Sequence, residues 1–286
     1  MSPLLWLLLA PHALLGFLLG GYVWIEEGQL VGNVSLTVDS QQRGVWIISN
    51  VAVHPDFRRR HIARELMDAS LQEAVRHGAR WVLLEVRADN SAAQQLYREL
   101  GFEVYDTTIE LSLPEHRWPH GRIEPSLQLR RRLPGDAHSL YHLAEAATTA
   151  ETREVRPISP HRYAMGLGHR LLTWLDDVLN RRKSLDWVLE LQGRIVALLQ
   201  LTGNHGRTPH RLQVTVHHRS RGPIEKPLLA AGLSTLQPFP RRRILSTISM
   251  SHPEAQEAFR EAGFEPLRVL DQLRLDLRHT TDWTVS

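Results

Sequence analysis

Between residues 45 and 102, the spacing of apolar residues changes repeatedly between that of a strand and that of a helix. Residues 45–53 are largely apolar and β-branched and end at a Pro-Asp turn, which predicts a strand. Helical spacing follows over 62–77, and a short apolar run at 81–86 predicts a buried strand. A second helix over 91–100 ends at a glycine. Two strands joined by a crossover helix predict a parallel pair, whose ligands bind at the carboxyl ends of the strands.

The turn between the first strand and its helix is rich in arginine, with the sequence RRRHIA over residues 58–63. The N–H groups at the start of a helix have no partner inside it, and the helix dipole adds positive potential there. This position, reinforced by guanidinium groups, favours a phosphate or diphosphate ligand. The alternative is a basic turn that only faces solvent, as runs of charge usually do.

The same pattern occurs twice along the chain. Similar segments begin at Val51 and Val214, and a second pair begins at Asp89 and Ser251. This spacing is far too long for a solenoid repeat, so it predicts two whole domains of one fold. Proline, tryptophan and glycine between them indicate a linker. The predicted boundaries are a first domain over residues 1–114, a linker over 115–125 and a second domain over 126–286.

The beginning of the second domain has no obvious counterpart in the first. Residues 127–148 read as a leading strand and helix, but nothing similar precedes Leu4. Three explanations stay open: the first domain dispenses with this unit, it borrows a strand, or the natural start lies upstream of Met1.

Residues 4–19 are almost entirely apolar, but Pro11 and His12 interrupt them and no basic residue precedes them. They are therefore neither a good signal peptide nor a good membrane span. The segment precedes a hairpin pattern, as does the helical stretch that begins at His169, so we expect it to pack as a helix of the first domain. Contact with a membrane surface is the less favoured alternative.

Composition excludes several classes of function. The 286 residues suffice for two domains, and their formal net charge of +3 is too small to indicate nucleic acid. The chain has no cysteine, which excludes disulfides, thiolate metal sites and a cysteine acyl-enzyme. His116 and His120 have a spacing found in metal sites, but no further ligand of suitable spacing lies nearby in the sequence, so we predict no metal.

The stretch from Ser49 to Phe102 resembles the core of the GNAT acetyltransferase superfamily, whose acetyl-CoA loop reads Gln/Arg-x-x-Gly-x-Gly/Ala after a strand. Here Arg58 opens the motif and Ala63 closes it, but His61 stands where the family has glycine. The later segment LEVRADNSAAQQLYRELGF is closest to the protein alanine N-acetyltransferases. The resemblance implies an α/β fold of the α+β mixed-sheet kind. Each of two tandem GNAT domains would have a mixed, largely antiparallel sheet flanked by helices, with a parallel pair forming the acetyl-CoA mouth.

The resemblance also implies a site for acetyl-CoA, the co-substrate. The backbone of one strand would pair with the pantetheine arm, the arginine-rich turn would wrap the diphosphate, and an asparagine would bind nearby. The cofactor-binding residues implied are Val51, Ala52, Val53, Arg58, Arg59, Arg60, His61, Ile62, Ala63, Arg64 and Asn90. A side chain at position 61 leaves the backbone donors in place but narrows the approach that glycine allows.

Two residues would carry the chemistry by the same resemblance. Tyr97 matches the general acid that protonates the departing thiolate, and its ordinary pKa of about 10 keeps its proton in place until then. Glu85 matches the general base, which a protonated amine needs before it can attack. The structural alternatives are a tyrosine that only fills the core and a strand glutamate that only pairs with an arginine.

The second copy departs from the pattern at two points. Its loop, residues 221–226, adds proline and glutamate where anion-binding N–H groups are needed, and Phe259 stands in place of Tyr97. We therefore expect a degenerate domain that shapes the substrate cleft or holds the pair together.

The function predicted from the sequence is that of a cytoplasmic N-acetyltransferase. It would transfer acetyl directly to a primary amine, either on a small molecule or on a protein N-terminus or lysine. The alternative is a non-catalytic acyl-CoA-binding or protein-interaction module. We expect no nucleic-acid partner, and a homodimer stays open. No motif identifies the acceptor.

Overall fold

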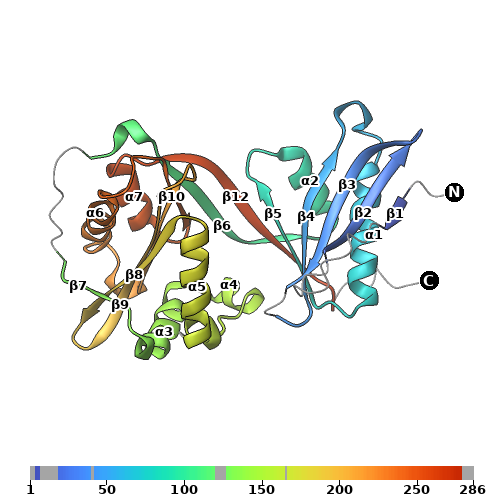
Figure 1. Ribbon diagram of the computed structural model, residues 1–286. Coiled ribbons are helices and arrows are strands. Elements are labelled where there is room, and N and C mark those ends of the chain that lie inside the picture. Colours follow the sequence, from blue (N-terminus) through green and yellow to red (C-terminus); the bar gives the residue numbers. More distant parts are fainter. Residues whose placement is uncertain (1–3, 7–18, 40–41, 120–126, 165, 279–286) are drawn as a thin grey trace. The chain divides into compact units, whose positions relative to one another are not determined.

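The computed structural model describes residues 4–6, 19–39, 42–119, 127–164 and 166–278 (Figure 1). The strands are β1 (Leu4–Trp6), β2 (Leu19–Glu26), β3 (Gln29–Val38), β4 (Val45–Val53), β5 (Trp81–Arg87), β6 (Glu103–Leu113), β7 (Leu129–Arg131), β8 (Arg182–Leu191), β9 (Arg194–Asn204), β10 (His210–Val216), β11 (Ile244–Ser249) and β12 (Glu265–Asp276). The helices are α1 (Ile62–Arg76), α2 (Ser91–Glu99), α3 (Ala137–Ala147), α4 (Ala150–Val155), α5 (Leu167–Leu179), α6 (Glu225–Leu236) and α7 (Pro253–Glu261).

The chain forms two compact units. The first unit comprises residues 1–105 and 271–286, and the second comprises residues 106–270. Each has a leading strand, a hairpin, a parallel strand pair with a crossover helix and a further helix, in the same chain order. The predicted mixed, largely antiparallel sheet with one parallel pair is present in both.

The first unit places α1 against its sheet. The strand order is β1-β2-β3-β4-β5-β12, and β1 to β4 pair antiparallel. At Gly32 of β3, an added Cβ would lie only 3.1 Å from side-chain carbons of both Ile62 and Leu66, so glycine allows α1 to approach closely. The core combines buried apolar residues of α1, α2 and the strands with Leu273 and Leu275 of β12.

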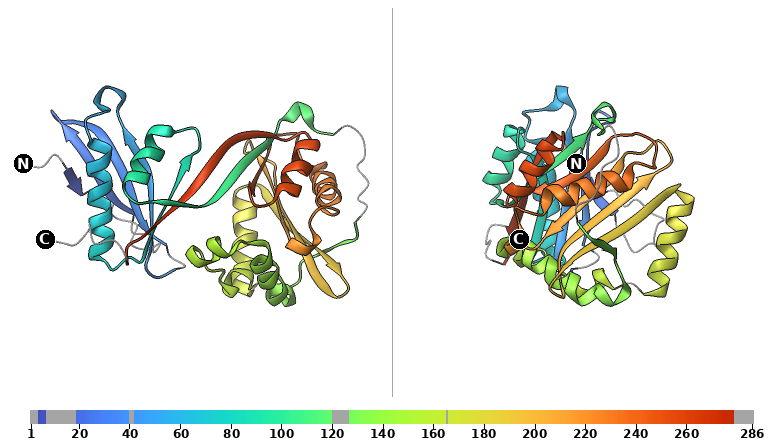
Figure 2. Two further views of the ribbon diagram at one scale, coloured as in Figure 1. Left: turned by 180° about the vertical axis from the view of Figure 1, so that it is seen from behind. Right: turned by 90° about the vertical axis from the view of Figure 1, so that its left-hand side faces the viewer.

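The second unit has helices on two faces of its sheet, whose order is β6-β11-β10-β9-β8-β7 (Figure 2). Because side chains alternate along a strand, neighbouring residues of β9 point to opposite faces. Leu199 packs in the core that includes α6 and α7, while Leu198 packs with Leu140 and Leu143 of α3. The sheet is thus covered on both sides.

The observed division of the chain differs from the predicted boundaries at 114 and 126. Two strands are divided between the units. Residues 106–113 of β6 belong to the second unit, and residues 271–276 of β12 belong to the first. The predicted linker is also partly structured. Trp118 is buried in the second unit's core, and its Nε1 donates to the carbonyl of Arg242 at 2.7 Å. Residues 120–126, including His120, lie outside the described residues.

The N-terminal segment starts as a strand, so the prediction of a helix over residues 4–19 is wrong at its beginning. Leu4 pairs with Trp24 and Trp6 with Tyr22, which makes β1 an antiparallel neighbour of β2. β7 pairs with β8 in the same way, so the first unit does have a leading strand. Residues 7–18 lie outside the described residues. Among the helices described, none is both long and apolar enough to cross a membrane.

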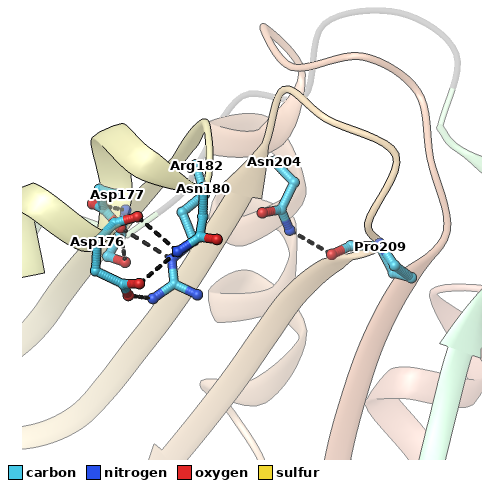
Figure 3. A network of polar contacts seen from close by, with 7 residues as sticks. Asp176, Asp177, Asn180, Arg182, Asn204 and Pro209 are labelled. Atoms are coloured by element: carbon cyan, nitrogen blue, oxygen red, sulfur yellow. Dashed lines mark hydrogen bonds and ion pairs between the residues drawn. The ribbon is translucent and has the colours of Figure 1, made fainter.

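Polar contacts hold the end of α5 against its own unit (Figure 3). Asp177 accepts hydrogen bonds from the backbone N–H and the hydroxyl of Ser184, both at 2.8 Å, and Arg182 pairs with both Asp176 and Asp177. From residue 171 on, the leucines, tryptophan and valine of α5 are exposed, and Leu179 is 79% exposed. The contacts named above are thus made by the acidic residues of the helix.

Candidate functional site

The parallel strands β4 and β5 separate toward their carboxyl ends. Their pairing runs only from Val45 opposite Trp81 to Ile47 opposite Leu83, although both strands continue beyond these residues. The pairing of β4 with β3 shifts register in the same region, where Asn50 has a φ of 53°. An extra residue in one strand bends it and increases its twist. This bulge accompanies an opening between the two strands.

The turn after β4 presents the start of α1 to this opening. Two of its residues have the left-handed backbone conformation, Arg59 with a φ of 61° and His61 with a φ of 59°. His61 is the N-cap of α1, but its side chain makes no capping hydrogen bond. The first intrahelical bond runs from the N–H of Glu65 to the carbonyl of His61. The three preceding N–H groups have no partner within the helix and are free to bind an anion.

A pocket of about 970 Å³ lies between β4, the start of α1 and α2. Its volume is near the upper end for ligand sites, as a molecule the size of coenzyme A requires. Ten of the eleven predicted cofactor-binding residues line it. They are Val51, Ala52, Val53, Arg58, Arg59, His61, Ile62, Ala63, Arg64 and Asn90. The predicted catalytic residue Tyr97 lines the same pocket.

The charge of the lining suits an anion. Three arginines and one glutamate give a formal charge of +2 with His61 neutral. The glutamate, Glu99, is paired with Arg64 at 3.3 Å. Arg58 is tied to the strand end because its Nε donates to the carbonyl of Val53 at 3.3 Å. Arg59 makes no hydrogen bond with another described residue, so its guanidinium is available to a ligand.

Tyr97 of α2 is 6% exposed and packs edge-on against Phe102. Burial raises the pKa of its phenol to about 12. The hydroxyl therefore keeps its proton at neutral pH. A thiol has a lower ordinary pKa, about 8.5, so at equilibrium the proton stays on the phenol and does not move to a thiolate. Proton donation would require the thiolate to form within hydrogen-bonding distance.

Two predicted residues do not line the pocket. Arg60 pairs with Glu26 at 3.1 Å, and its guanidinium lies 4.9 Å from the centre of the Phe57 ring. Glu85 is an exposed residue of β5. Its assignment as a base stays a prediction, since a base serves the acceptor rather than the cofactor.

The pocket also contains residues that sequence reasoning missed. Phe57 closes a short 3₁₀ turn after β4, and α2 contributes Ala92, Ala93, Leu96 and Glu99. The helical spacing of the α2 residues is visible in the sequence and could have placed them beside Tyr97. No such spacing in the sequence marks Phe57 as a residue of the pocket.

The equivalent place in the second unit is filled by a side chain of the chain itself. Glu225, the first residue of α6, is 1% exposed and accepts hydrogen bonds from the N–H of Gly222 at 2.7 Å and from His252 at 2.9 Å. Burial alone would raise the pKa of Glu225, but the bonds from His252 and the backbone outweigh it and lower the pKa. A carboxylate thus sits where α1 offers free N–H groups.

The left-handed conformation of His61 explains why glycine suits this position, and it gives a test. A β-branched side chain is strongly disfavoured at such a φ. We expect His61→Val to be about 1–2 kcal/mol less stable than His61→Gly. Urea unfolding of the two variants measures the difference. The control is the same two substitutions at His77, whose φ is −96°. There, the glycine variant should not be more stable than the valine variant by this amount. Equal stabilities for the two variants at position 61 would contradict the assigned backbone.

Residues 4–102 match the model of the acetyltransferase (GNAT) family. The chain is 36% identical over 86 residues to the [ribosomal protein bS18]-alanine N-acetyltransferase of Salmonella typhimurium, a match that covers 27% of this chain and 58% of the relative. It is 43% identical over 53 residues to the protein of the same name from Escherichia coli K12, covering 18% and 36%. The chain therefore spans less than two thirds of the length of these relatives.

Two solved structures share the fold over most of the chain. A GCN5-related N-acetyltransferase from Sphaerobacter thermophilus has a TM-score of 0.64 at 18% identity, covering 93% of this chain and 83% of that one. A tandem GNAT protein from the clavulanic acid biosynthesis pathway has a TM-score of 0.58 at 20% identity, covering 97% and 86%. These similarities confirm the predicted tandem GNAT fold.

Proposed function

We propose that the protein transfers acetyl from acetyl-CoA to a primary amine, a function that the match of residues 4–102 to the acetyltransferase (GNAT) family model supports. The observation that carries the proposal is the pocket where uncapped N–H groups of α1, three arginines and the hydroxyl-bearing ring of Tyr97 meet. It combines an anion site with a proton donor in one pocket.

In the proposed complex, the N–H groups of Ile62, Ala63 and Arg64 bind the diphosphate, and Arg59 adds charge. The pantetheine arm follows residues 51–53 of β4, which holds the thioester at the opening between β4 and β5. Asn90 binds close to the arm, although its side chain already caps α2 by accepting from the N–H of Ala93 at 3.2 Å.

The proposed reaction is direct transfer in a ternary complex. The amine approaches from the side opposite the cofactor and loses a proton to Glu85, directly or through water. Its nitrogen attacks the thioester carbonyl, the C–S bond breaks, and the thiolate takes the proton of Tyr97. The second proton lost by the nitrogen, as the amide forms, returns through water to the tyrosinate. An acyl-enzyme on cysteine is excluded, because the chain has no cysteine.

The acceptor we would test first is a protein N-terminus. The relatives are named as alanine N-acetyltransferases of ribosomal protein bS18, and alanine has no amine in its side chain. The second unit is proposed to be non-catalytic, which is supported by Glu225 in its anion position and by the buried Phe259 in place of Tyr97.

The test is calorimetric titration with acetyl-CoA, followed by a thiol-release assay with alanine-starting peptides, lysine peptides and polyamines. We expect one acetyl-CoA per chain and CoA release that depends on an amine. Arg59→Glu should weaken acetyl-CoA binding about tenfold or more, since a charge-assisted contact becomes repulsive. Arg219→Glu, an exposed arginine of the second unit's turn, is the matched control and should bind normally.

The outcomes separate the candidate functions. Acetyl-CoA binding without release by any amine would favour the non-catalytic acyl-CoA-binding module. The absence of binding, or equal weakening by the two substitutions, would overturn the assignment of the pocket.

A further inference from the structure

A second, smaller pocket of about 200 Å³ lies entirely within the second unit, bounded by β9, β10, α3 and the turn Pro160–Tyr163. Its polar lining consists of Arg132, Arg162, Tyr163, Gln200 and Thr215, and its other four lining residues are leucines and an alanine. No acidic residue lines it, and all nine lining residues are described. Its volume equals roughly seven water molecules, so it suits a small ligand.

Arg132 is the unusual residue of this pocket. Its side chain is 9% exposed, and a buried guanidinium requires partners for its five N–H groups. One terminal nitrogen donates to Asp186 at 2.9 Å and the other to the carbonyl of Tyr163 at 2.6 Å. The Nε–H is buried with no hydrogen-bond partner among the described residues. The donors of Arg132 are therefore only partly satisfied.

The surroundings add to the demand for a negative charge. Asp186 balances only one of the two arginines, because Arg162 forms no ion pair within the described residues. The hydroxyl of Tyr163 is a neutral donor: burial raises the pKa of its phenol, although Arg162 and Arg132 lower it in part. Gln200 and Thr215 supply further hydrogen-bonding groups on the strand side.

We propose that this pocket of the second unit binds a small organic carboxylate, with Arg132 as its main anchor. A planar carboxylate matches the fork of a guanidinium, and its single charge matches the net charge of two arginines and one aspartate. The leucine side chains of the lining accommodate a short hydrocarbon portion, which inorganic phosphate lacks. The proposal concerns binding alone and does not depend on acetyl transfer by the first unit.

The test uses the full chain, with calorimetry and ligand-observed NMR of propionate, succinate and glutamate. Succinamide, which is uncharged, and inorganic phosphate serve as comparison probes. We expect at least one of the three carboxylates to bind saturably, and both comparison probes to bind at least about tenfold more weakly. No binding by any carboxylate, or tighter binding of phosphate or succinamide, would overturn the proposal.

Variants then locate the site. Arg132→Gln should weaken carboxylate binding about tenfold or more, and Arg162→Gln should weaken it severalfold. Arg130→Gln is the matched control: Arg130 also forms ion pairs, with Asp136 and Glu190, but does not line the pocket. If Arg132→Gln fails to fold, Arg162→Gln and Gln200→Leu carry the test, because neither breaks a buried ion pair. If Arg130→Gln and the pocket variants bound the carboxylate with equal affinity, the assignment of the binding site to this pocket would be wrong.

Discussion

Tyr97→Phe should lower the turnover of amine-dependent CoA release about tenfold or more, which corresponds to about 1.4 kcal/mol of activation free energy. The phenol is buried at the pocket, and its raised pKa of about 12 keeps its proton available at neutral pH. Phenylalanine keeps the ring and its packing against Phe102 but removes that proton. Affinity for acetyl-CoA should hardly change, because the interaction develops only as the thiolate forms.

The matched control is Tyr105→Phe. Tyr105 is another buried tyrosine of the first unit, with its hydroxyl bonded to Gln272 at 2.9 Å, but it does not line the pocket. Its substitution should leave turnover near that of the unmodified protein. Steady-state kinetics with a saturating amine and calorimetry of acetyl-CoA separate the two effects. Unchanged turnover in Tyr97→Phe would remove this residue from the mechanism.

Leu275→Ala should destabilise the first unit by about 2–5 kcal/mol, although the residue lies near the C-terminal end of the chain. Its side chain is 3% exposed and belongs to the core that also contains Tyr97, Leu100 and Phe102. Truncation removes buried methyl groups and leaves a cavity beneath α2. Urea unfolding measures the loss, and hydrogen exchange of the α2 amides locates it.

Leu267→Ala provides the comparison within the same strand. Leu267 is 47% exposed, so its truncation should change the free energy of unfolding by no more than about 0.5 kcal/mol. If α2 kept its exchange protection in Leu275→Ala, or if both variants lost the same stability, β12 would not complete the first unit's core.

The site was accessible to sequence reasoning where local rules decide the structure. The helix expected over 62–77 spans Ile62–Arg76, and the strand expected over 81–86 spans Trp81–Arg87. Helical spacing and terminal glycines act within a few residues, so they can be read without knowledge of the tertiary fold. The same pattern placed the arginine-rich turn at the start of α1, whereas Val51, Ala52, Val53, Asn90 and Tyr97 were named from the resemblance to the GNAT family.

Tertiary pairing determined what the sequence did not reveal. Leu4–Trp6 is a strand because β2 offers it an open edge, whereas its apolar run alone suits a helix equally well. The exchange of β6 and β12 between the units leaves no local signature, since each strand keeps its alternating pattern wherever it pairs. The sequence did show a glutamate in the second unit's loop, but not that Glu225 is bonded to His252, 27 residues away in the chain.

The crossing of β12 also affects the order of events on the ribosome. Residues 1–105 are made before the second unit, but the core beneath the pocket includes Leu273 and Leu275, which follow the second unit in the chain. Domains usually fold as units during synthesis, N-terminal domain first. Here residues 271–276 of β12 are made only after the second unit, so the first unit cannot complete its core before residues 106–270 have been synthesised.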